Sequence, residues 1–61
     1  MDKQVEQLFL IGDLEFHIAD LPKRDNIFAG KMLKVWDRYR RLTERQEAVV
    51  REILKRVEVS V

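Results

Sequence analysis

The stretch Asn26 to Val57, NIFAGKMLKVWDRYRRLTERQEAVVREILKRV, predicts two amphipathic helices joined by a tight turn at Leu42-Thr43. The Thr43 hydroxyl can accept the backbone N–H three residues on, and the Gln46 amide can reach back to the Thr43 N–H. This capping box marks the start of a helix. The residues of one face then recur at the spacing of a helical stripe: Gln46, Val49, Val50, Ile53, Leu54 and Val57.

The helix before the turn should begin where Asp25 or Asn26 can cap it. Its apolar face is predicted to consist of Phe28, Ala29, Met32, Leu33, Trp36 and Tyr39. We expect Trp36 in the core. Tyr39 is expected to be half-buried, with stacking on a base as the alternative. Gly30 costs a helix about 1 kcal/mol relative to alanine, which suggests that another group approaches closely there.

The segment from Asp2 to Leu21 allows two interpretations. A β-hairpin would use the alternating stretch 14–18 and a two-residue turn at Gly12-Asp13. A single helix would instead gather its core residues on one face: Leu10, Ile11, Leu14, Ile18 and Leu21. We expect the helix, because four acids also fall within one narrow helical arc: Asp2, Glu6, Asp13 and Asp20.

Three further apolar residues lie beside this acidic arc and away from the main core stripe, namely Val5, Phe9 and Phe16. One explanation is that a first helix touching both others needs a wider apolar face. The other is that Phe9 and Phe16 belong to a contact patch for another protein or a second copy. Both explanations remain open at this point.

Charge is distributed unevenly along the chain. Residues 1–22 carry a net charge of −4 and residues 23–45 a net charge of +5, whereas residues 46–61 are balanced. Lys31, Lys34, Arg38 and Arg41 follow one another at steps of three, four and three residues, and Arg45 extends this basic stripe into the turn. Such a stripe is typical of a surface that meets phosphates or an acidic protein. Its alternative is an ordinary solvated helix face, partly paired with the acidic first helix.

No residue set indicates a chemical reaction. The chain of 61 residues has no cysteine and a single histidine, His17, which excludes a thiolate metal site and leaves a weak constellation for zinc. No Ser/His/Asp arrangement and no phosphate-cradling glycine loop is present. We therefore expect a non-catalytic protein without cofactor or small-molecule substrate. The longest apolar run, residues 8–11, predicts no membrane span, and we expect a cytoplasmic protein.

The central stretch resembles a known pattern. Phe28-Ala29, Met32-Leu33, the turn Leu42-Thr43-Glu44-Arg45-Gln46, Val49-Val50 and Ile53-Leu54 are similar to a helical hairpin with a central LT-x-[KR]-Q signature found in phage nucleic-acid-processing proteins. In size and layout the chain resembles the small accessory proteins encoded beside the UvsW helicase in T4-type phages. The resemblance covers residues 26–57. It implies a small helical bundle related to the accessory module of RecQ-type helicases, and a role in phage or bacterial DNA replication, recombination or repair.

These observations predict one all-α domain, a three-helix bundle with a C-terminal helical hairpin. Its helices are expected near residues 3–20, 26–41 and 44–57, with a linker at 21–25. The leading functional hypothesis is an accessory protein that binds DNA weakly and salt-dependently, with phosphate contacts from Lys31, Lys34, Arg38, Arg41 and Arg45. The alternative is a module that docks on a host or phage enzyme, such as a helicase, through Phe9, Phe16, Asp13 and Asp20.

Overall fold

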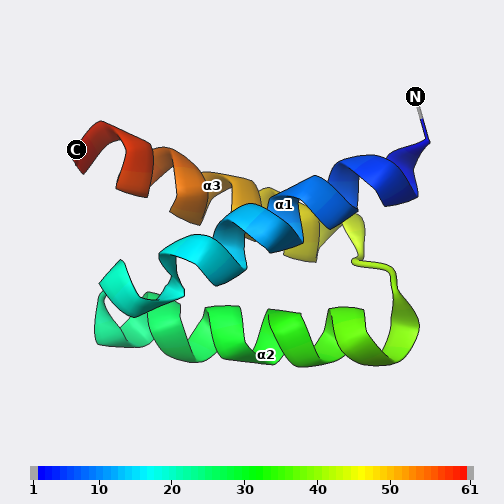
Figure 1. Ribbon diagram of the computed structural model, residues 1–61, viewed down its shortest axis with the longest axis horizontal. Coiled ribbons are helices and arrows are strands. Elements are labelled where there is room, and N and C mark those ends of the chain that lie inside the picture. Colours follow the sequence, from blue (N-terminus) through cyan, green and yellow to red (C-terminus); the bar gives the residue numbers. More distant parts are fainter. Residues whose placement is uncertain (1, 61) are drawn as a thin grey trace.

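The described residues form three α-helices and one short 3-10 turn, joined by short connections. The computed structural model describes residues 2–60, and for residues 58–60 the backbone alone. The elements are α1 (Lys3–His17), the 3-10 turn η1 (Ile18–Asp20), α2 (Lys23–Tyr39) and α3 (Glu44–Ser60). The predicted all-α bundle is confirmed, and the β-hairpin alternative for the first segment is wrong. Figure 1 shows α1 crossing the α2–α3 hairpin, with the N-terminus at the end where α2 connects to α3.

Local sequence explains both ends of α1. The Asp2 carboxylate caps its N-terminus by accepting the Gln4 backbone N–H at 3.1 Å. At the other end the chain tightens into η1, and Leu21 adopts an extended conformation with φ −81° and ψ 147°. A residue that precedes proline is driven out of the helical region, so Pro22 ends this first helical segment at Leu21.

The second helix begins earlier than predicted. α2 starts at Lys23, with Pro22 in the N-cap position, so most of the expected linker 21–25 is helical. Neither Asp25 nor Asn26 caps the helix. The Asn26 side-chain amide instead donates to the Ile18 carbonyl at 2.7 Å and thereby holds η1 against the first turn of α2. The prediction failed here because proline is well suited to a helix start, where its missing N–H costs nothing.

The connection between α2 and α3 contains the predicted capping box. The Thr43 N–H donates to Gln46 Oε1 at 2.9 Å, and the Gln46 N–H donates to Thr43 Oγ1 at 3.1 Å. α2 ends at Tyr39, two residues before the predicted end at Arg41. Arg40 has a left-handed conformation with φ 53°, and its N–H donates to the Trp36 carbonyl at 2.7 Å. This αL cap turns the chain out of the helix, although glycine is the usual residue in that conformation.

The core lies where the three helices meet. α1 contacts both α2 and α3. The buried apolar side chains are Ile11, Leu14, Leu21, Ala29, Met32, Trp36, Leu42, Val50, Ile53 and Leu54. The predicted core stripes are thus confirmed apart from Tyr39, whose expected half-burial is wrong because α2 ends there and the residue is 64% exposed.

Gly30 also differs from its prediction. A Cβ atom built on Gly30 meets no heavy atom within 4 Å, so no neighbouring group approaches closely. Its φ is not positive, and the helix does not need glycine for its backbone conformation. The packing of the bundle therefore does not explain this residue.

Candidate nucleic-acid interface

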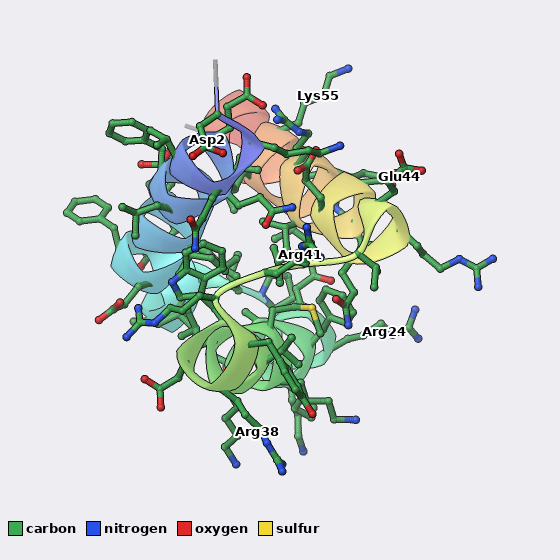
Figure 2. The ribbon with its side chains drawn as sticks, turned by 90° about the vertical axis from the view of Figure 1, so that its right-hand side faces the viewer. Asp2, Arg24, Arg38, Arg41, Glu44 and Lys55 are labelled. Atoms are coloured by element: carbon green, nitrogen blue, oxygen red, sulfur yellow. The ribbon has the colours of Figure 1, made fainter. Side chains whose placement is uncertain are left out.

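Three of the predicted phosphate ligands lie together on the outward face of α2. Lys31, Lys34 and Arg38 are exposed, on the side of the helix opposite buried Ala29 and Trp36. In Figure 2 Arg38 points away from the bundle. Among the described residues, none of these three cations forms an ion pair with an acid, so the partial pairing with the acidic first helix that belonged to the alternative of a solvated face is not found for them. Their charge is available to an outside anion.

The other two predicted cations are separated from this face by the end of the helix. Arg41 is exposed in the connection between α2 and α3, which interrupts the continuous stripe that the spacing predicted. Arg45 is exposed in the first turn of α3. Arg45 and Arg56 are about three helical turns apart, so both project from the same side of α3. Since Arg56 reaches Asp25 of α2 at 3.2 Å, this side is the one next to α2.

Tyr39 adds an accessible aromatic ring to the basic face. The Arg38 guanidinium carbon lies 5.5 Å from the centre of the Tyr39 ring, within range of a cation–π contact. With most of its ring in solvent, Tyr39 can also stack on a planar group such as a nucleobase. The sequence contained the signal for its exposure, because Tyr39 comes directly before the Arg40-Arg41 pair that ends the helix.

A partly open hollow of about 650 Å³ lies at this end of the bundle. It is bounded by the start of α1, the end of α2 and the start of α3, and its lining residues are Asp2, Lys3, Gln4, Gln7, Tyr39, Arg40, Arg41, Leu42, Thr43 and Glu44. Three cations and two carboxylates therefore surround it, which leaves a small positive excess. Figure 2 looks into this end and shows Arg41 between Asp2 of α1 and Arg38 of α2.

Buried Gln7 holds the wall of the hollow in place. Its side-chain amide donates to the Leu42 carbonyl at 3.0 Å and to Glu47 Oε1 at 3.1 Å, and its carbonyl accepts the Leu42 N–H at 2.9 Å. One side chain of α1 thus satisfies both backbone groups of Leu42 and contacts α3. Sequence reasoning missed this role. The available signal was a polar residue in the register of the core stripe, four residues before Ile11.

The same contact changes the acidity of Glu47. The hydrogen bond from Gln7 lowers the pKa of the Glu47 carboxyl below its ordinary value of 4.5, and Arg51 and Lys3 lower it further, against a smaller rise from burial. Arg51 donates to Glu47 Oε2 at 3.2 Å. Glu47 is therefore charged at neutral pH. Through Gln7, the start of α3 is joined to α1 and to Leu42 in the connection between α2 and α3.

The residues of the alternative interface lie on another part of the surface. Phe9 and Phe16 project from α1, 68% and 80% exposed, so the explanation that they widen the core face is wrong. Asp13 and Asp20 are exposed as well. Figure 2 shows α1 and α2 at different corners of the bundle, so the outward faces of the two helices point in different directions.

Within residues 2–60, no helix has both the length and the apolar character that a membrane span requires. The described part of the chain also contains no cluster of three His, Asp or Glu side chains that could hold a metal ion. Comparison of the sequence and the structure with protein-family models, curated proteins and solved structures finds no match in any of the three.

Proposed function

We propose that this protein is a non-catalytic accessory factor that binds nucleic acid through the outward face of α2. The observation that carries the proposal is the group of exposed cations Lys31, Lys34 and Arg38, unpaired with acids in the described part of the chain, beside the exposed ring of Tyr39. Cations neutralise phosphates, and an aromatic ring stacks on a base of any sequence. This combination suits single-stranded nucleic acid without sequence preference.

Arg41 and Arg45 extend the proposed surface around the end of the bundle. A strand that follows α2 from Lys31 to Tyr39 meets the connection next, where Arg41 is exposed, and then the first turn of α3. The N-terminus of α3 also favours negative charge there, although its capping box already occupies two of the free N–H groups. We place DNA replication, recombination or repair in a phage-infected or bacterial cytoplasm as the setting, which the resemblance of residues 26–57 supports.

The proposal predicts weak binding with a steep salt dependence. If the surface neutralises about four phosphates of a single strand, the slope of log affinity against log salt concentration should be about −2.8. Charge reversal at Lys34 and Arg38 together should weaken binding to all sequences alike and reduce the steepness of this slope by about 1.4, since two phosphate contacts are lost. Both side chains point into solvent, so the fold should tolerate the changes.

The test is a titration of isotope-labelled protein with short single-stranded and branched DNA, followed by NMR at several salt concentrations. Lys55→Glu is the matched control, because Lys55 is an exposed cation of α3 that lies far from Arg38 in Figure 2. The control should bind DNA almost as the unmodified protein does, apart from the small effect of net charge. Absence of binding at low salt, or equal losses in the control and in the α2 variant, would refute the proposed interface.

Tyr39 allows a second check that does not depend on charge. Tyr39→Phe keeps the stacking ring and should bind single strands normally, whereas Tyr39→Ala should lose about 1–3 kcal/mol of binding free energy. Equal affinities for the alanine and phenylalanine variants would exclude base stacking at this position.

A further inference from the structure

α1 has a second apolar face, on the side opposite the core. The core side carries Gln7, Ile11 and Leu14. The opposite side carries, at steps of four, three and four residues, Val5, Phe9, Gly12 and Phe16. Val5 is 41% exposed, and both phenylalanines are much more exposed than that. Leu8, also exposed, lies at one border of this stripe. Solvated helix faces are normally polar, so a stripe with the spacing of a helix–helix contact indicates a covered surface.

Gly12 has no function in the folding of the bundle. A Cβ atom built on Gly12 meets nothing within 4 Å, and the residue has no positive φ. Glycine in an exposed helix interior costs about 1 kcal/mol relative to alanine. At the centre of the stripe, however, it leaves an open notch between Phe9 and Phe16 where the backbone of another helix can approach closely.

Acidic side chains border the same stripe. Asp13 of α1 and Asp20 at the end of the following turn η1 are exposed, and neither forms an ion pair within the described residues. Asp2 and Glu6 continue this border toward the N-terminus, where Asp2 also caps α1. A helix that covers the apolar stripe therefore meets a row of negative charges along one edge.

We infer that the outward face of α1 docks a cationic amphipathic helix of another protein, with apolar residues on Phe9 and Phe16, its backbone near Gly12, and lysine or arginine side chains against Asp13 and Asp20. The negative charges beside the stripe favour a cationic helix over the other possible partners. A second copy in an α1-to-α1 contact would bring together two segments of charge −4. A contact of α1 with the outward face of α2 would find no apolar stripe, because the exposed large apolar side chains of α2 are Ile27 and Tyr39, which lie twelve residues apart near opposite ends of the helix. An anionic membrane surface would repel the acidic border.

This inference is independent of nucleic-acid binding, because the two faces lie on different helices. Together they describe an adaptor that holds a partner protein with α1 and a nucleic acid with α2. A variant with Lys34→Glu and Arg38→Glu should consequently dock the helix normally, which separates a failure of this inference from a failure of the proposed function.

The test uses two synthetic helical peptides of equal length and identical leucine stripes, one bordered by lysine and the other by glutamate, titrated into the labelled protein. The lysine peptide should shift the NMR signals of α1 around Phe9, Gly12 and Phe16, and it should bind at least about tenfold more tightly than the glutamate peptide. Phe9→Ala with Phe16→Ala should weaken its binding at least about tenfold. Asp13→Asn with Asp20→Asn should reduce the preference for lysine.

Gly12→Ala distinguishes docking from damage to the fold. The substitution should raise the midpoint of urea unfolding and at the same time weaken binding of the lysine peptide. Four results would overturn the inference: equal binding of the two peptides, signal shifts located elsewhere on the protein, unchanged peptide affinity in Gly12→Ala, or self-association of the free protein through α1 in sedimentation experiments.

Discussion

Replacement of Gln7 by alanine tests the polar contact that joins α1 to the helical hairpin. The Gln7 side chain is 3% exposed and satisfies both backbone groups of Leu42, a residue that is itself 3% exposed. Loss of the amide leaves a buried N–H and a buried C=O without partners, at about 1–3 kcal/mol each. Because the site borders the open hollow, water can reach part of it, and we expect a total loss of about 2–3 kcal/mol.

That loss is large for a chain of this size. At the usual 0.05–0.15 kcal/mol per residue, 61 residues correspond to a free energy of unfolding of about 3–9 kcal/mol. Urea unfolding is readily followed by the fluorescence of Trp36, the single tryptophan, which is 5% exposed in the native state. Gln7→Ala should shift the urea midpoint strongly downward without a change of slope.

Gln4→Ala is the matched control for this experiment. Gln4 lies one turn earlier on α1 and also donates to a carbonyl of the connection, that of Arg40 at 3.3 Å, but its side chain is exposed. Its removal should cost at most about 0.5 kcal/mol, as for an ordinary surface substitution. If Gln7→Ala costs no more than Gln4→Ala, burial does not make the contact important and the reasoning is refuted.

Three further predictions concern stability. Glu47 has a lowered pKa in the folded protein, so its charge contributes stability above its ordinary value of 4.5 that is lost as the pH falls through the lower folded value. Glu47→Gln should therefore be less stable than the unmodified protein at neutral pH, and the difference should shrink in acid; a pH-independent difference in urea midpoints would contradict this. Gly30→Ala should raise the free energy of unfolding by about 1 kcal/mol, because the new methyl group meets nothing within 4 Å, and an unchanged or lower urea midpoint would argue against it. Thr43→Ala should cost about 1 kcal/mol by removing the acceptor of the Gln46 N–H, a loss that should be absent in Thr43→Ser when thermal unfolding is compared by circular dichroism.

The helices themselves follow from local rules that act over a few residues. The capping box at Thr43 satisfies orphan N–H groups within one turn, so its formation needs nothing from the rest of the chain. The stripes around Trp36 and Ile53 have the period of a helix and could be assigned to the core before the bundle was known. The exposure of Lys31 and Lys34 follows from the same period, because both lie opposite the core stripe of their helix.

The tertiary structure determined which helix faces are buried and where α2 ends, which the helical period of the sequence did not. Helical spacing places Phe9 and Phe16 on one face of α1. Only the tertiary structure shows that α2 and α3 pack against the other face and leave this one exposed. The burial of Gln7 likewise depends on a connection that lies 35 residues away in the sequence. The end of α2 at Tyr39 removed Arg41 from the basic stripe. Local hydrogen bonds and the helical period thus determined the helices and the basic face of α2. The exposure of Phe9 and Phe16 and the burial of Gln7 were determined by contacts between residues distant in sequence, which no local pattern encodes.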